Sequence, residues 1–205
     1  LSGMPQDAAE MRNFANMLEE QIVSTRVAVD ANPNDYMALA KWGELLLELA
    51  MLKQGEEATA ILLQSIAKLK RSLELYGDNS HAMVVLASAL NARAFLQQDP
   101  DVAAQLFESS KKNFERALEL DPSNSRCRQL LEAMENAPAL HAQVVQQLQM
   151  QAMMGQQSGY PGAMGGKAAS DDEWIYDALG WSILVTGAVG LLVYMNVSAP
   201  REYAP

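Results

Sequence analysis

Few side chains in this sequence are of the types that carry out chemistry. Its two histidines, His81 and His141, lie far apart along the chain, and neither belongs to a recognisable metal-binding or nucleophile motif. The sequence also lacks a P-loop, a dinucleotide-binding glycine motif and paired cysteines at zinc spacing. Cys127 lies on an apolar helical stripe, so we expect a core thiol rather than a reactive one. We therefore expect no enzyme, no metal site and no cofactor.

The composition favours one folded domain with an appendage. The chain has 205 residues, of which 49% are apolar, so its soluble part can bury a core. The formal net charge of −10 argues against nucleic acid as a partner, because phosphates attract basic surfaces. An acidic chain suits a partner that is itself basic. The single cysteine excludes an intrachain disulfide, which fits a reducing compartment.

An internal repeat organises much of the chain. Three similar segments, 28–35, 72–79 and 117–124, each end a helical pattern at Pro or Gly and then offer Asn, Asp or Ser to cap another helix. Pro33, Gly77 and Pro122 in these segments are 44 and 45 residues apart. This self-similarity indicates an array of helical hairpins, with a period longer than the ~34 residues of a tetratricopeptide repeat (TPR).

Apolar and small residues within each period follow the TPR pattern. They are Leu39, Trp42, Gly43, Leu46, Leu69, Ser72 and Gly77 in the first repeat, and Met83, Leu86, Ala87, Leu90, Ser110, Phe114, Ala117 and Pro122 in the second. The small ones among them are expected where paired helices approach most closely, and the excess length falls around residues 55–63. We predict an all-α fold: a TPR-like helical repeat array of two elongated repeats with flanking capping helices, plus one C-terminal transmembrane helix.

Helices are expected on both sides of the array. One apolar stripe predicts a helix before it (Met11, Phe14, Leu18, Ile22, Thr25, Val29), and another predicts a helix after it (Cys127, Leu130, Leu131, Met134). A further helical stretch follows Pro138 and ends near Met153. The Gly, Gln and Pro content of the next residues cannot form a packed core, which predicts a flexible tether.

A membrane anchor is predicted at the C-terminal end. Residues 178–199 contain no charged side chain and would span ~33 Å as a helix, close to the ~30 Å of a bilayer's hydrocarbon core. Aromatic residues flank the run, as they do at membrane interfaces. Only six residues follow residue 199, so we expect a tail anchor. Small residues within the run are candidates for helix–helix contact: Gly180, Ser182, Thr186, Gly187 and Gly190.

Because the sequence shows no catalytic motif, binding of a peptide is the remaining function that it suggests. In a TPR array the first helix of each repeat lines a concave face, where the inward positions would be Met37, Ala40, Glu44, Leu47 and Glu48, and then His81, Val84, Ser88, Asn91 and Phe95. Apolar residues with acidic flanks complement a short amphipathic helix with a Leu stripe and Arg residues, the character of mitochondrial targeting peptides. Alternatively, the two glutamates only solvate a helix face, and Met37 and Leu47 belong to the core.

Three runs of the sequence carry a specific resemblance. WGELLLEL (residues 42–49), APALHA (137–142) and YDALGWSIL (176–184) closely resemble the plant- and green-algal-type 20-kilodalton receptor subunit of the TOM translocase. The resemblance covers the array, the tether and the anchor, and the entry into the anchor is its most specific part. It implies a mitochondrial outer-membrane receptor with two elongated TPR motifs that captures presequences of cytosolic preproteins and passes them to the TOM pore.

The expected organisation follows from the pattern and the resemblance together. We assign residues 1–153 to a cytosolic TPR-like receptor domain, 154–173 to the tether, 174–199 to the anchor and 200–205 to a short tail in the intermembrane space. The expected partners are presequence peptides, other TOM subunits including the pore, and outer-membrane lipid, with no nucleic acid.

Two other functions remain open from the sequence. One is a tail-anchored, TPR-like adaptor of the mitochondrial outer membrane that recruits a fission GTPase, although such adaptors have little tether before the anchor. The other is a chaperone-docking TPR that clamps a C-terminal carboxylate. That clamp needs Lys, Asn and Arg at positions that here hold Ala40, Glu44 and Ser88, and the glutamate would repel a carboxylate.

Overall fold

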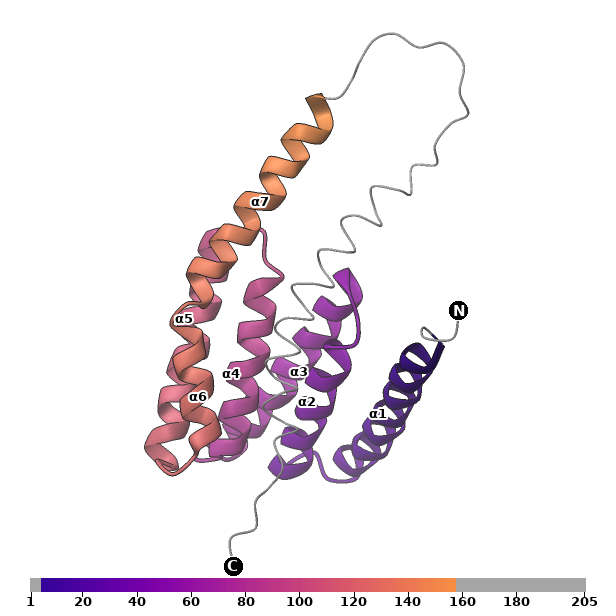
Figure 1. The fold of residues 1–205 in the computed structure, drawn as a ribbon. Helices are drawn as coiled ribbons and strands as arrows, with labels where there is room; N and C mark the ends of the chain where they lie inside the picture. Colours follow the sequence, from indigo (N-terminus) through magenta and orange to yellow (C-terminus); the bar gives the residue numbers. More distant parts are fainter. Residues whose placement is uncertain (1–4, 158–205) are drawn as a thin grey trace, which may run out of the picture. The chain divides into compact units, whose positions relative to one another are not determined.

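The computed structural model describes residues 5–157, with side chains from residue 11 to residue 150, and all regular structure in this part is helical (Figure 1). The helices are α1 (Pro5–Ala31), α2 (Tyr36–Ala50), α3 (Gly55–Leu75), α4 (Ser80–Phe95), α5 (Pro100–Leu120), α6 (Ser125–Met134) and α7 (Ala137–Gln157). The predicted all-α class is confirmed.

The chain divides into two compact units, residues 1–138 and 139–205. The first unit holds α1 to α6, and α7 supplies the described part of the second. Between residues 5 and 157 no helix is both long and apolar enough to cross a membrane. The predicted anchor and its contact candidates (Gly180, Ser182, Thr186, Gly187 and Gly190) lie outside the described residues, as does most of the predicted tether.

Polar side chains begin helices α2, α4 and α6, as the three similar segments predicted. The Asp35 carboxylate accepts hydrogen bonds from the backbone N–H groups of Met37 and Ala38 at 3.0 and 2.9 Å. Asn79 accepts from Ala82 at 3.0 Å, and Asn124 accepts from Cys127 at 2.9 Å. Each cap satisfies backbone donors that the first turn of a helix leaves unpaired. These short polar segments therefore determine where α2, α4 and α6 start.

Helices α2 and α3 pack as one hairpin and α4 and α5 as a second, and the same hydrogen bond closes both. The Ser65 hydroxyl of α3 donates to the Gly43 carbonyl of α2 at 2.6 Å, and the Ser110 hydroxyl of α5 donates to the Ala87 carbonyl of α4 at 2.6 Å. Both serines are fully buried. Equivalent residues of the two sequence periods therefore occupy equivalent places in the two hairpins.

Small residues lie where the paired helices approach most closely, as predicted. A Cβ atom added at Gly43 would lie 2.5 Å from Cγ of Leu69, so only glycine fits there. Ala87, Ser72 and Ala117 are all at most 1% exposed. The excess length of the period lies in the second helices, since α3 and α5 each have 21 residues whereas α2 and α4 have 15 and 16.

Three apolar clusters hold the first unit together. One joins α2, α3 and α4 around Leu62, Leu69 and Leu86, and the second joins α4, α5 and α6 around Phe107 and Phe114. The third joins α1 to α2 through Leu18, Leu45 and Leu49. In Figure 1, α1 accordingly lies beside α2, and the first hairpin lies beside the second.

The helix predicted before the array is confirmed as α1, and its apolar stripe is only partly buried. Leu18 and Val29 are buried, whereas Met11 and Phe14 are 59% and 42% exposed. The helix has 27 residues and its partner α2 has 15, so at ~1.5 Å per residue α1 is far longer than the helix that it packs against. Met11 and Phe14 therefore lie where α2 offers too little surface to bury them.

Candidate functional site

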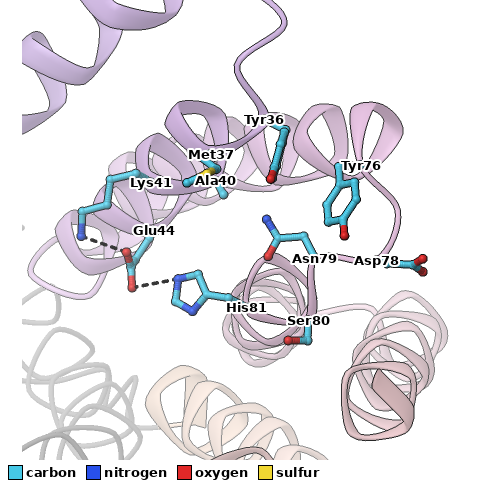
Figure 2. Close-up of a pocket in the computed structure, with 10 residues that line it drawn as sticks. All are labelled: Tyr36, Met37, Ala40, Lys41, Glu44, Tyr76, Asp78, Asn79, Ser80 and His81. Atoms are coloured by element: carbon cyan, nitrogen blue, oxygen red, sulfur yellow. Dashed lines mark hydrogen bonds and ion pairs between the residues drawn. The ribbon is translucent and has the colours of Figure 1, made fainter. Parts of the chain in front are cut away.

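An open pocket of about 440 Å³ lies between the first half of α2, the end of α3 and the start of α4 (Figure 2). Its lining combines aromatic, apolar and charged side chains: Tyr36, Met37, Ala40, Lys41, Glu44, Tyr76, Asp78, Asn79, Ser80 and His81. Four of the ten predicted groove residues are among them. The others lie farther along α2 or α4.

The helix caps and the helical period bring these side chains together. Asp35 starts α2, so Met37, Ala40 and Glu44, spaced three and four residues apart, share one face of that helix. Asn79 starts α4 and puts His81 in its first turn. Because α2 and α4 contact one another, that turn faces the middle of α2, as Figure 2 shows for His81 and Glu44.

Glu44 is the charged centre of the pocket. Its Oε1 lies 3.4 Å from Nε2 of His81, and its Oε2 lies 2.9 Å from Nζ of Lys41. The hydrogen bond from His81 and then the charge of Lys41 lower the pKa of Glu44 to about 2, against the opposing effect of burial. The same hydrogen bond raises the pKa of His81 above its ordinary 6.5. At neutral pH the pocket therefore contains a carboxylate that is already paired.

Aromatic rings form the other end of the pocket. Tyr36 and Tyr76 lie with ring centroids 4.8 Å apart and planes tilted by 36°. Tyr76 and Met37 are 47% and 63% exposed, so both offer apolar surface to a bound molecule. Asp78 lies at the rim, 3.6 Å from the guanidinium of Arg116. The pocket thus presents apolar surface together with charged groups of both signs.

The remaining candidates of α2 have different surroundings. Ala40 lines the pocket but is 4% exposed and belongs to the core cluster of α2, α3 and α4. Leu47 is partly buried against that cluster, whereas Glu48, one turn after Glu44, is exposed. Partial desolvation and the neighbouring Glu44 charge raise the pKa of Glu48. A peptide role for these residues stays a prediction.

The candidates of α4 beyond His81 lie outside the pocket and are half-buried. Val84 packs against the cluster of α4, α5 and α6, and Ser88 donates to the Val84 carbonyl at 2.9 Å. Phe95 meets the ring of Phe107 edge-on at 5.2 Å. The buried side-chain oxygen of Asn91 has no hydrogen-bond partner among the described residues.

Sequence reasoning missed the residues that the turn before α4 contributes. Tyr76, Asp78, Asn79 and Ser80 reach the pocket because the turn lies against the start of α2. Lys41 could have been found, since it precedes Glu44 by three residues on a helix. No local signal shows that Tyr36 and Tyr76 meet.

The described residues contain no group of three or more His, Cys, Asp or Glu side chains that could hold a metal ion. Cys127 is fully buried, and its thiol donates to the Phe114 carbonyl at 3.4 Å. Burial raises the pKa of this thiol, which disfavours the nucleophilic thiolate. The predicted core role of Cys127 is confirmed.

Comparison with known proteins identifies the family. A family model described as the plant-specific mitochondrial import receptor subunit TOM20 matches residues 14–196. The mitochondrial import receptor subunit TOM20-2 of Arabidopsis thaliana is 33% identical over 182 residues, covering 84% of this chain and 87% of the relative. TOM20-3 of the same plant is 30% identical (83% and 85% covered), and TOM20-1 is 26% identical (89% and 97% covered). This chain, with its charged and aromatic pocket on two helical hairpins, belongs to the plant-specific family of TOM20 mitochondrial import receptor subunits.

Proposed function

We propose that this import receptor binds the amphipathic presequences of cytosolic preproteins and delivers them to the TOM pore. The observation that carries the proposal is the pocket of α2 and α4, in which exposed apolar groups (Met37, Tyr76) lie beside an ionised carboxylate (Glu44). A presequence offers the complementary surfaces, an apolar stripe and basic side chains on one short helix. The family's role is reception rather than catalysis, and family membership does not favour the fission or chaperone adaptor.

We further propose that the two hairpins are elongated TPR-like repeats. The matching bonds of Ser65 and Ser110, and the close approaches at Gly43 and Ala87, support this reading. In such an array α2 and α4 are the first helices of the repeats, and their exposed faces form one continuous groove. The groove would begin at the pocket and pass Glu48 on α2 and Ser88 and Asn91 on α4.

The proposed topology is a tail anchor in the mitochondrial outer membrane. It is supported by the uncharged run of residues 178–199 and by its place after the receptor domain (1–153) and tether (154–173). This order puts the pocket on the cytosolic side, where preproteins arrive. The anchor's small residues are proposed to contact other TOM subunits.

Peptide binding to the full chain in non-ionic detergent micelles tests the receptor function. We compare a presequence peptide with the same peptide carrying Ala in place of its Leu stripe, using isothermal titration calorimetry. We expect the first to bind and the second to bind much more weakly, because the apolar face supplies most of the association energy. Equal affinity for the two peptides, or no binding of either, would contradict the proposal.

The acidic contribution is tested with the double variant Glu44→Lys, Glu48→Lys. We expect its affinity for the presequence to fall roughly tenfold at low salt and less at high salt, because mobile ions screen exposed charges. The control is Glu108→Lys with Glu115→Lys on α5, which changes the net charge equally on exposed side chains outside the pocket. If the two double variants bind alike, the glutamates of α2 only solvate a helix face.

A further inference from the structure

The Glu44 carboxylate of the pocket already has ion-pair partners within the protein when no peptide is bound. Both oxygens of Glu44 have a cationic partner, Lys41 at 2.9 Å and His81 at 3.4 Å, and only 25% of the glutamate side chain is exposed. Because little of the Glu44 side chain is exposed, a basic side chain of a bound peptide has to compete with these two partners for the carboxylate. The structure distinguishes between the two partners.

His81 is the partner that can leave. Lys41 is on the same helix as Glu44, three residues away, whereas His81 comes from α4 and makes the longer contact. The imidazole is 62% exposed and lies in the first turn of α4, so it can rotate toward solvent. A histidine can also give up its charge near neutral pH, whereas a lysine does so only in strongly basic solution.

We propose that Glu44 is the subsite for one basic side chain of the bound peptide, and that His81 is a resident counter-ion which the peptide displaces with release of a proton. This inference rests on the proposed receptor function. A guanidinium fits the site well, because it keeps its charge near neutral pH and can donate a hydrogen bond to Oε1 while Lys41 stays on Oε2. The proton that His81 loses goes to the solvent, and the peptide's cation restores the charge balance at Glu44.

The walls of the pocket suit such a side chain. The exposed ring of Tyr76, stacked near Tyr36, lies in the same pocket and offers an aromatic face to the stem or cation of an arginine. Exposed Met37 continues this surface along α2 and can contact apolar residues of the same peptide. The pocket would then bind one basic residue of the peptide together with the apolar residues next to it.

The charges around His81 determine when it leaves. Glu44 of α2 holds the imidazolium, while Lys41 of α2 and Arg126 of α6 repel it. Glu48 adds a second negative charge near Glu44 on α2, and Asp78 lies in the turn before α4. The attraction prevails, so the pKa of His81 lies above 6.5 and the imidazole still competes with a peptide cation at that pH.

Calorimetry with the full chain in non-ionic micelles tests the proposal between pH 6 and 8.5, in two buffers of different ionisation enthalpy. We expect affinity for an Arg-containing presequence to rise with pH, by at most about tenfold per pH unit because one proton is exchanged, and then to level off. We expect proton release on binding, visible as a buffer-dependent heat. The same peptide with neutral citrulline in place of Arg should show neither effect.

Single substitutions distinguish the displacement of His81 by the peptide from general effects of pH on binding. His81→Ala should bind at pH 6 as tightly as the unaltered protein does where its affinity has levelled off, with no proton release, and Glu44→Gln should bind weakly at every pH. The control Glu108→Gln breaks an exposed ion pair with Lys112 on α5 and should keep the full pH dependence. Circular dichroism checks folding, and His81→Asn replaces His81→Ala if the latter unfolds.

The outcomes distinguish this inference from the receptor function itself. Presequence binding that is equally tight from pH 6 to pH 8.5, without proton release, would overturn the exchange at Glu44 and leave the receptor function standing. Absence of binding by the unaltered chain at every pH would overturn both. The chain has two histidines, so NMR can follow the His81 imidazole directly, using His81→Ala for assignment. Its pKa should fall when the peptide binds.

Discussion

Glu44 and His81 link the stability of the protein to pH at the scale of single side chains. The folded pKa of Glu44 lies near 2, below its ordinary 4.5, so its contribution is complete above pH 4.5 and lost as the pH falls toward 2. The folded pKa of His81 lies above 6.5, so its contribution is complete below pH 6.5 and lost as the pH rises through the folded value. The ion pair stabilises fully only between these limits.

We therefore expect the difference in unfolding free energy between the unaltered protein and Glu44→Gln to be largest at about pH 5–6, with a size of about 1 kcal/mol because solvent screens a half-exposed pair. This difference in unfolding free energy should become smaller toward pH 8 and toward pH 3. Urea denaturation at each pH measures it. A difference that does not vary with pH would show that the two side chains are not coupled in solution.

Gly43 shows at the same scale how tightly α2 and α3 approach. Alanine favours a helix over glycine by about 1 kcal/mol, but its Cβ would lie 2.5 Å from Cγ of Leu69, a fully buried side chain that would have to shift. We expect Gly43→Ala to destabilise the protein by about 1–2 kcal/mol in urea denaturation. Gly77→Ala is the control, because its nearest added contact is an ordinary 3.7 Å, and it should be close to neutral.

At the scale of helices, each hairpin is held by apolar packing and by a buried serine hydroxyl at the equivalent position, and Ser72 adds a second such bond, to the Tyr36 carbonyl, in the first hairpin. Ser65 and Ser110 reach across to the carbonyls of Gly43 and Ala87, so truncating either leaves a buried acceptor without that partner. We expect Ser65→Ala and Ser110→Ala each to cost about 1 kcal/mol of unfolding free energy. If both are neutral, the bonds contribute nothing net, and the hairpins depend on shape alone.

A neighbouring residue on α5 provides the control for this prediction. Ser109 is exposed and bonds only to the Gln105 carbonyl of its own helix, at 2.8 Å. Ser109→Ala should therefore change stability by less than about 0.5 kcal/mol. The contrast between two adjacent serines isolates the bond between helices from any effect of helix propensity.

At the scale of the whole molecule, the proposed anchor determines where the receptor acts. We expect a chain that ends at residue 170 to be released from mitochondrial membranes by alkaline carbonate, and the full chain to stay with them, because the uncharged run that would span the bilayer is lost. Replacing Ser182, Thr186 and Gly190 by Leu should keep the chain in the membrane and weaken its association with other TOM subunits. Retention of the shortened chain after carbonate treatment would contradict the anchor.

Local features of the sequence determined the elements of this protein. Caps such as Asp35 and Asn79 bond to backbone within three residues, and the apolar period of each helix is a property of neighbouring turns. Capping and periodicity therefore located the helices and the repeat without knowledge of their packing. The close approach at Gly43 was also readable, because a small residue recurs there as Ala87 in the second period.

Only the tertiary structure decided how these elements form a site. Glu44 meets His81 because two hairpins pack at one particular angle, and Tyr36 meets Tyr76 because the end of α3 returns beside the start of α2. No local pattern specifies either contact. The same packing leaves Met37 exposed and buries Ala40, although both were equally good groove candidates by spacing. The sequence alone thus determined the helices and their repeat. The packing of side chains between those helices determined which residues share a pocket and which charge neutralises which.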